Sequence, residues 1–352
     1  MKNFYKYLAV AMIFTVVLSL CVLAGCRRTA ALHQAAVAND LTEQPNLLMS
    51  VGQLKELIDS GEENLILIGV INPSAELVPS SPSSTPIEGS FLVWRGDYCG
   101  GGSTEAAASE VTGFRRSQAE MESLLSRAGV TQDSKIIVYS ADAMHDAARF
   151  VWQLKMLGLK DVNYLDGGIN SWIAAGYPTG SGVRLAEQPP VVEFSAPDYA
   201  PWEFDVPLSR VREALLNPDE WVVIDTRSRE EFAGRQTGSS AGAFGTGRIK
   251  GAINISWIKA VDQSTLLIRS KAELKAIYGS AIKDKNVIVF CQSGARSAHT
   301  WLVLTQVLGA ANVYNYNGSW IEWSFAASEA SDGRFPGILE LTEVWRDNRR
   351  PI

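Results

Sequence analysis

The segment Asn286-Val-Ile-Val-Phe-Cys291-Gln-Ser-Gly-Ala-Arg296-Ser297-Ala-His299 contains the signals that decide the fold. Four apolar residues, Val287 to Phe290, are rich in β-branched side chains and predict a short buried strand ending at Cys291. Gly294 permits a tight loop, and apolar residues then recur at helical spacing. The segment therefore predicts a strand, a short loop and a helix, with a cysteine at the start of the loop.

This loop has the features of a site that holds an anion. Unpaired backbone N–H groups at a helix N-terminus and the helix dipole both favour negative charge, and thiolate is the nucleophilic form of cysteine. Arg296 adds a positive charge close to Cys291. A lone cysteine at a strand end is usually a small buried hydrophobic residue, but its combination with Gly294, Arg296 and Ser297 favours a reactive thiol.

The composition is that of a globular chain long enough for two ordinary domains. Of its 352 residues, 46% are apolar and 20% are charged, which separates the chain from disordered proteins. The net charge of −6 gives no reason to expect nucleic acid or an anionic membrane surface as a partner.

The N-terminus predicts an export signal. Two lysines precede an apolar run over 8–23, which leads into Leu23-Ala-Gly-Cys26. This ending resembles the bacterial lipoprotein box, which implies that 1–25 are a signal peptide, that Cys26 is lipidated and that 26–46 are a tether. The expected location is the bacterial cell envelope, on the periplasmic or outer-surface side. An uncleaved anchor and plain secretion are the alternatives, although the run is shorter than the roughly 20 residues that span a bilayer.

Two of the four cysteines belong to the folded part of the chain. Cys21 and Cys26 belong to the signal, so Cys99 and Cys291 remain. A disulfide between them is the structural alternative in an exported protein, but we expect free thiols because pairing would consume the reactive cysteine. Since no metal-ligand spacing is present in the sequence, we expect neither a metal nor another cofactor.

An internal repeat relates the two halves of the chain. The matching residues are 151 positions apart in three pairs: Ser140 with Cys291, Gly167 with Gly318 and Trp172 with Trp323. Each copy alternates short apolar strands with helical stretches such as 147–157 and 298–308.

This alternation predicts an α/β fold, in which each copy is a mostly parallel sheet flanked by helices. The expected domains are 47–180 and 208–345. They are joined by the proline-rich stretch 181–207, which is predicted to be a long linker on the surface.

Several motifs in order resemble the tandem-domain rhodaneses over about residues 47–345. They are the loop Cys291-Gln-Ser-Gly-Ala-Arg-Ser297, the strand end Asp225-Thr-Arg227, the segment Gly247–Asn254 and the segment Asn317–Trp323. In the related phosphatases the loop arginine comes six residues after the cysteine. Arg296 comes five residues after Cys291, and the resemblance therefore implies a pocket sized for a sulfur atom.

The resemblance also implies roles for individual residues. Cys291 would be the catalytic nucleophile, and Asp225 would have a structural role beside it. Binding of the anionic donor is implied for Arg227, Arg296, Gln292, Ser293, Gly294 and Ser297.

The first copy resembles the inactive half of these proteins. Ser140, Gly69 and Ile71 stand where the cysteine, the aspartate and the arginine would be. This half is expected to form one side of the active site. His145 and Asp146 are expected to be polar loop residues rather than catalysts.

The implied activity is that of a thiosulfate sulfurtransferase without a cofactor. A small anionic sulfur donor would load Cys291 as a persulfide, and cyanide or a thiol, which a protein could carry, would accept the sulfur. The membrane would be reached through the lipid anchor only, and nucleic acid is not an expected partner. The alternative is a sulfane-sulfur carrier or sensor that loads once and serves a partner protein. A third reading, a noncatalytic interaction module, fits the first copy alone.

Two further expectations concern specificity and oxidation. Enzymes of the mercaptopyruvate type carry a Gly-Ser-Gly-Val-Thr-like sequence after the cysteine, whereas the residues after Cys291 are Gln-Ser-Gly-Ala-Arg, and this difference favours thiosulfate as the donor. Glu231 also falls about where those enzymes carry a second arginine, so its carboxylate is expected to repel 3-mercaptopyruvate. Cys99 is expected on a loop facing the second domain, either as an inert thiol or as a resolving partner for an oxidised Cys291.

Overall fold

The computed structural model describes residues 47–71, 85–101, 111–141, 144–235, 243–330, 335 and 337–347. These residues lie within one compact unit, Gln44–Ile352. The predicted signal peptide, Cys26 and the tether lie outside the described residues. None of the helices in the described part of the chain has the length and apolar character needed to cross a bilayer.

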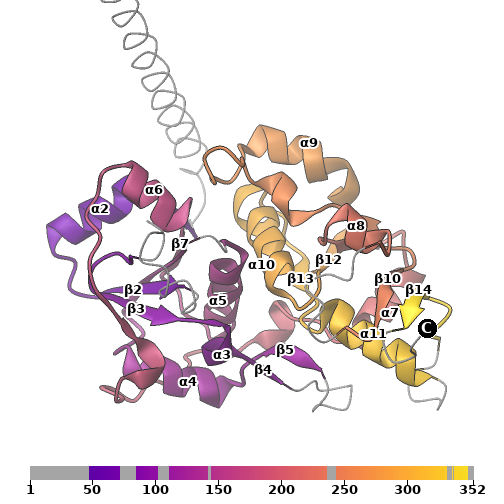
Figure 1. Ribbon diagram of the computed structural model, residues 1–352, viewed down its shortest axis with the longest axis horizontal. Helices are drawn as coiled ribbons and strands as arrows, with labels where there is room; N and C mark the ends of the chain where they lie inside the picture. The colour runs from indigo at the N-terminus through magenta and orange to yellow at the C-terminus, as the bar shows by residue number, and fades with distance from the viewer. Residues whose placement is uncertain are drawn as a thin grey trace, which may run out of the picture. The chain divides into compact units, whose positions relative to one another are not determined.

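The first half contains a six-stranded sheet in which every pairing is parallel (Figure 1). In spatial order its strands are β1 (Leu48–Met49), β7 (Val162–Leu165), β6 (Lys135–Ser140), β2 (Leu65–Val70), β3 (Ser90–Val93) and β8 (Gly182–Arg184). A separate antiparallel pair joins β4 (Cys99–Gly101) to β5 (Thr112–Arg115).

The second half repeats this plan with a four-stranded parallel sheet. Its order is β11 (Ile253–Asn254), β9 (Trp221–Asp225), β12 (Asn286–Phe290) and β13 (Val313–Asn315). An antiparallel pair joins β10 (Gly245–Ile249) to β14 (Thr342–Asp347). The register sets Phe290 opposite Asp225, which brings the Asp-x-Arg motif beside the cysteine loop.

Helices alternate with the strands in both halves. The first half has α2 (Val51–Ser60), α3 (Arg95–Tyr98), α4 (Gln118–Arg127), α5 (Met144–Met156) and α6 (Gly168–Ala174). The second half has α7 (Leu208–Leu216), α8 (Arg229–Phe232), the 3₁₀ turn η5 (Trp257–Ala260), α9 (Lys271–Ile282), α10 (Ala295–Leu302) and α11 (Ser319–Glu329). The prediction of an α/β fold with two similar domains is confirmed.

The segment from Asn286 to His299 folds as its local pattern predicts. The strand β12 leads into a loop and then into α10, and a π-helical turn, η6 (Val303–Val307), continues that helix. In the first half, the strand β6 is likewise followed along the chain by the helix α5. The two helices lie against each other where the halves meet (Figure 1).

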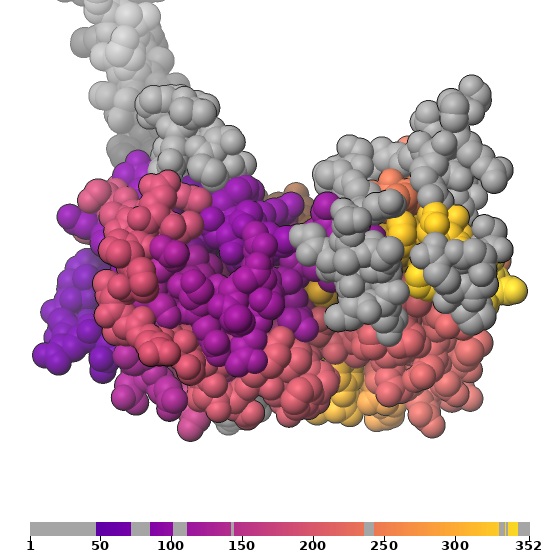
Figure 2. All heavy atoms as spheres, turned by 90° about the horizontal axis from the view of Figure 1, so that it is seen from below, coloured from indigo at the N-terminus to yellow at the C-terminus, as the bar shows by residue number. Residues whose placement is uncertain are grey.

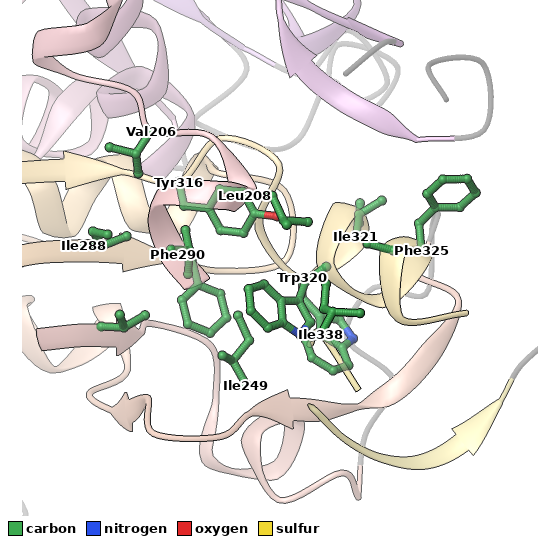
Figure 3. Close-up of a cluster of buried hydrophobic side chains, with 14 of the residues drawn as sticks. Val206, Leu208, Ile249, Ile288, Phe290, Tyr316, Trp320, Ile321, Phe325 and Ile338 are labelled. Atoms are coloured by element: carbon green, nitrogen blue, oxygen red, sulfur yellow. The ribbon is translucent and has the colours of Figure 1, made fainter. Parts of the chain in front are cut away.

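The core of the second half includes Phe290, the last residue of β12 before Cys291. Phe290, Ile249 and Trp320 are almost fully buried and point toward one another (Figure 3). Full burial of such side chains stabilises the fold by roughly 1.5–3 kcal/mol each. Val111 and Phe114 of the first half join this cluster, so the two halves share part of one core.

The stretch between the halves is more structured than a linker. Gly182–Arg184 forms β8, which pairs with β3 at the edge of the first sheet. This strand lies just beyond the predicted domain end at residue 180, and its pairing with β3 bonds its backbone groups; the predicted domain boundaries stay a prediction. The rest contains the 3₁₀ turns η3 (Leu185–Glu187) and η4 (Pro201–Glu203). Rose-coloured residues of this stretch lie on the surface in Figure 2, and Trp202 is 69% exposed.

Candidate active site

Cys291 lies directly after β12, at the carboxyl end of an interior strand of the second sheet. Open α/β sheets bind ligands beyond the carboxyl ends of their strands, so the position suits a reactive group. The thiol is 1% exposed and adjoins a cavity of about 260 Å³. The cavity is lined by Cys291, Gln292, Ser293, Ala295, Arg296, Arg95 and His145.

The loop requires a glycine at position 294. Gly294 precedes α10 with a φ of 82°, in the left-handed region. A Cβ at this position would lie 2.9 Å from the carbonyl oxygen of Asn317. The Gly294 carbonyl accepts hydrogen bonds from Asn315 Nδ2 at 3.0 Å and from Arg149 Nη1 at 3.2 Å, so the loop is held from two directions.

The start of α11 holds two further carbonyls of the loop, those of Cys291 and Gln292. The backbone N–H groups of Trp320 and Ile321 donate to the carbonyls of Cys291 and Gln292, at 3.0 and 3.1 Å. The Cys291 N–H donates to Ser319 Oγ at 3.2 Å. With its carbonyls bonded on this side, the loop has N–H groups free to face the sulfur.

The surroundings lower the pKa of the Cys291 thiol below its ordinary value. Burial is the largest influence and raises the pKa, because it disfavours the thiolate. The charge of Arg296, the Ser297 hydroxyl and the backbone N–H groups of Ser297 and Ser293 together outweigh it. The balance favours thiolate, the form that attacks sulfur.

Ser297 links the sulfur to a buried amide. Its Oγ lies 3.5 Å from Cys291 Sγ and 2.7 Å from Asn315 Oδ1. The hydroxyl has one hydrogen, so a bond to the thiolate competes with the bond to Asn315. The contribution of Ser297 to thiolate stability is therefore partial.

Arg296 is held by the carboxylate that we expected to face the donor. Glu231 closes a capping box with Ser228 at the start of α8 and accepts two hydrogen bonds from Arg296, at 2.6 and 2.9 Å. It is 3% exposed and does not line the cavity. The expectation that Glu231 repels a carboxylate donor is wrong in its geometry, because the ion pair with Arg296 occupies this side chain.

Arg227 lies beside the loop but does not line the cavity. It is 2% exposed and donates from Nε and Nη2 to Asp225, and from Nη2 to the Gly247 carbonyl at 2.9 Å. Its guanidinium also stacks over Trp320, 4.8 Å from the ring centroid. This engagement is structural, and donor binding by Arg227 stays a prediction that the geometry does not support. Asp225 is fully buried and organises this arginine.

The second arginine at the cavity is Arg95, which the sequence analysis missed. It begins α3 of the first half, and its Nε and Nη2 atoms donate to the buried carboxylate of Asp146 at 2.7 and 3.0 Å. Its Nη2 also lies 3.2 Å from His145 Nε2. Arg95 is so far from Cys291 in the sequence that no motif spacing connects the two residues. The one available signal was the expectation that the first copy forms one side of the active site.

The prediction that His145 and Asp146 are loop residues is wrong, because α5 begins at Met144 and both residues lie in its first turn. His145 lines the cavity, and burial, the largest influence, lowers its pKa to about 4 despite the nearby Asp146 carboxylate. The imidazole is therefore neutral at pH 7. Ser140, in the position of the cysteine, is buried, and its hydroxyl has no hydrogen-bond partner among the residues described.

A neighbouring cavity shares four lining residues with this one, namely Arg95, Gln292, Ser293 and Ala295. The second cavity also contains Cys99, which starts β4. Burial raises the pKa of the Cys99 thiol against the opposing influence of Arg149. Cys99 and Cys291 are both free thiols, and an oxidative link between them stays a prediction.

Arg149 connects the first half to the loop. This α5 residue is fully buried and donates to the carbonyls of Gly294 and Gly113 and to Asn317 Oδ1. Its guanidinium lies over the Trp152 ring. Among the described residues, no group of three or more His, Cys, Asp or Glu side chains is arranged to hold a metal ion.

Comparison with known proteins places both halves in one family. The family model described as Rhodanese-like domain matches residues 83–175 and 210–326. The chain is 34% identical over 226 residues to SseA of Mycobacterium bovis, a protein named provisionally as a thiosulfate sulfurtransferase, covering 62% of this chain and 73% of SseA. It is 33% identical over 224 residues to the sulfur carrier protein TtuD of Thermus thermophilus, covering 59% of this chain and 74% of TtuD. The crystal structure of Tum1 from Saccharomyces cerevisiae superimposes with a TM-score of 0.69 at 19% identity, covering 86% of this chain and all of Tum1; this likeness concerns the fold.

Proposed function

Since the chain belongs to the rhodanese-like domain family and carries two copies of the domain, we propose that it is a sulfurtransferase that works through a persulfide on Cys291. The donor is a small anion such as thiosulfate, and the acceptor is a thiol or cyanide. The observation that carries this proposal is the environment of Cys291 Sγ, where the charge of Arg296 and the N–H groups of Ser293 and Ser297 lower the thiol pKa.

The first step loads the sulfur. The Cys291 thiolate attacks the outer sulfur of thiosulfate, the sulfur–sulfur bond of the donor breaks, and sulfite leaves with the electron pair. Arg296 and Arg95, which both line the cavity, offset the negative charge of the donor. The loop N–H groups hold the negative persulfide that forms.

The second step releases the sulfur. An acceptor thiolate or cyanide attacks the outer sulfur of the persulfide, and the electron pair of the broken bond returns to Cys291 Sγ. The thiolate is regenerated without a redox partner. A thiolate with a lowered pKa is also the better leaving group in this step.

Loading can be tested directly. Protein mixed with excess thiosulfate should gain one sulfur atom by intact mass, and cyanide should remove it with formation of thiocyanate. The Cys291→Ser variant should show neither adduct nor turnover, because a serine hydroxyl stays protonated. Sulfur mapped to Cys99, or full activity of the variant, would contradict the proposal.

A sulfur carrier is the second candidate, supported by the similarity to TtuD, which is named a sulfur carrier protein. A carrier and an enzyme would share the loading step. They differ in turnover: an enzyme converts many equivalents of thiosulfate with cyanide, whereas a carrier stops after one sulfur per chain until a partner protein is added.

The preference for thiosulfate over 3-mercaptopyruvate now depends on the loop residues Gln292 to Arg296 alone, since Glu231 does not line the cavity. The ratio of kcat/KM for the two donors tests it, and a value favouring mercaptopyruvate would overturn it. We also propose that Cys26 carries a lipid that anchors the protein in the cell envelope, on the evidence of the Leu23-Ala-Gly-Cys26 sequence.

A further inference from the structure

Two arginines that line the cavity of Cys291 are each held by a buried carboxylate. Arg296 of the second half pairs with Glu231, which is 3% exposed. Arg95 of the first half pairs with Asp146, which is fully buried. Because removing a carboxylate from water is costly, a fully buried one indicates that the arginine it holds has a fixed position.

Three contacts orient the guanidinium of Arg95. Its Nε donates to Asp146 Oδ1 at 2.7 Å, and its Nη2 donates to Asp146 Oδ2 at 3.0 Å. The same Nη2 lies 3.2 Å from His145 Nε2. Within the described part of the chain, these contacts leave Nη1 for a further acceptor. The side chain is 44% exposed, so a ligand in the cavity can reach it.

The contact with His145 requires a neutral imidazole. An arginine N–H can only donate, so Nε2 of the histidine accepts and we assign the ring proton to Nδ1. Burial lowers the pKa of His145 to about 4, which leaves Nε2 without a proton at neutral pH. The ring packs against Trp257 of the second half, with the ring centroids 4.9 Å apart. Both halves therefore hold the imidazole that contacts Arg95.

An anionic sulfur donor offers an acceptor for the remaining nitrogen. In thiosulfate the oxygens belong to the sulfur that leaves as sulfite, so they take no part in the bond that Cys291 forms. Arginine N–H groups bind such oxygens through short, charge-assisted hydrogen bonds. A contact to these oxygens would hold the donor in the cavity of Cys291, which Arg95 also lines.

We propose that Arg95 recognises the anionic oxygens of the sulfur donor, and that His145 and Asp146 are positioning residues that orient its guanidinium. The cavity then selects donors that carry an oxyanion group next to the sulfur they give up, in preference to uncharged sulfane compounds. This inference rests on the proposed function and assigns the choice of donor to residues of the first half.

Two alkylating agents measure the recognition of an anion without any sulfur transfer. Iodoacetate and iodoacetamide both alkylate a thiolate with loss of iodide, but only iodoacetate carries a carboxylate. The ratio of their rates at Cys291, followed by peptide mass, reports how well the cavity binds an anionic oxygen group. Both agents react with the same thiolate, so a change in the thiol pKa cancels in this ratio.

The variant for Arg95 has to avoid an unpaired buried charge. Arg95→Gln alone would leave the Asp146 carboxylate without its partner, which is strongly destabilising. The double variant Arg95→Gln/Asp146→Asn replaces the ion pair with neutral groups and should lower the ratio of iodoacetate to iodoacetamide by about tenfold, the size of one charge-assisted hydrogen bond. Arg210→Gln, which removes an exposed arginine of another ion pair, is the matched control and should keep the wild-type ratio. An unchanged ratio in the double variant would overturn recognition by Arg95.

Two substitutions separate the hydrogen bond of His145 from its packing. His145→Phe keeps a ring beside Trp257 but removes the acceptor, and it should lower the ratio by about threefold, the size of one ordinary hydrogen bond. His145→Gln has an amide oxygen that can accept from Arg95 and should restore the wild-type ratio. Equal ratios in the two variants, whether high or low, would overturn the positioning role of His145.

Single-turnover loading by thiosulfate extends the test to the donor. In the double variant the half-saturating concentration of thiosulfate should rise about tenfold, and the limiting rate should stay within about twofold, because a contact to a non-reacting group contributes equally to the bound donor and the transition state. A lower limiting rate with unchanged half-saturation would overturn the inference. Failure of thiosulfate to load wild-type protein would instead contradict the proposed function, and the alkylation ratios would still test Arg95.

Discussion

Arg149 of the first half donates a hydrogen bond to the carbonyl of Gly294, in the reactive loop of the second half, across 3.2 Å. The two residues are far apart in sequence, and the arginine is fully buried. The same carbonyl accepts from Asn315, whose Oδ1 bonds Ser297. The half in which Ser140 takes the place of Cys291 therefore helps to set the conformation of the loop that surrounds the thiol.

The first prediction concerns this contact. Arg149→Ala should release the Gly294 carbonyl, raise the pKa of Cys291 and slow loading by about tenfold, the size of one lost charge-assisted hydrogen bond. The pH dependence of alkylation of Cys291 by iodoacetamide measures the pKa. Arg149→Lys should recover part of the effect, and Lys135→Ala, a partly exposed residue of the same half, should behave as wild type. An unchanged alkylation profile in Arg149→Ala would show that the contact only stabilises the fold.

Removing either charge of the ion pair between Arg296 and Glu231 should shift the pKa of Cys291, and the two shifts should have opposite signs. Glu231→Gln keeps a similar shape but removes a negative charge that offsets Arg296, so the pKa of Cys291 should fall further. Arg296→Gln removes the positive charge that lowers this pKa, so the pKa should rise. The same alkylation profiles measure both, and shifts in one direction for both variants would contradict the electrostatic account.

A buried imidazole predicts acid sensitivity of the fold. His299 is fully buried beside the rings of Trp257 and Tyr164, and burial, followed by the nearby His145, lowers its pKa to about 3. In the unfolded chain the pKa is about 6.5. Because the unfolded state binds the proton more readily, stability should be complete above about pH 6.5 and fall progressively toward pH 3.

His299→Phe tests this assignment. Phenylalanine cannot titrate, so the variant should lose less stability than wild type between pH 6.5 and pH 4, measured by urea denaturation. His145, whose pKa is about 4, contributes in the same direction and remains in the variant. Parallel pH profiles for the two proteins would contradict the assignment.

The Asp166 carboxyl group predicts a loss of stability as the pH rises from about 4 to 7. It is buried and accepts a hydrogen bond from the Ile268 N–H of the second half at 3.0 Å. Burial outweighs the backbone N–H groups and raises its pKa to about 7, above the ordinary value, so the stability that it contributes is present below about pH 4 and is lost as pH rises through 7. Asp166→Asn should be more stable than wild type at pH 8 and should lose this advantage at pH 4. A constant difference between the two proteins would exclude titration of Asp166.

The N-terminal prediction concerns the cell rather than the fold. Cys26→Ser should move the full-length protein from the membrane fraction to the soluble fraction, because the lipid chains would have no attachment site. Fractionation of cells expressing each protein measures this. Wild-type protein in the soluble fraction would contradict lipid anchoring.

Much of the fold was readable from the sequence because its signals are local. The β-branched run before Cys291, the glycine at 294 and the helical spacing after it predicted β12, the loop and α10. The separation of 151 residues between Cys291 and Ser140 predicted the second copy. Local steric preferences and side-chain periodicity produce such patterns whatever the rest of the chain does.

The partners of the thiol were decided by the tertiary structure alone. Packing α5 against α10 brings Arg149 to Gly294, and the first half also delivers Arg95 to the cavity. Arg227 is buried and donates to Asp225, because a charged guanidinium that is removed from water needs hydrogen-bond acceptors in the protein. These pairings depend on distances between residues remote in the chain, which no local pattern encodes. The sequence alone therefore identified Cys291 as the candidate nucleophile, and the packing of the two halves decided what surrounds it.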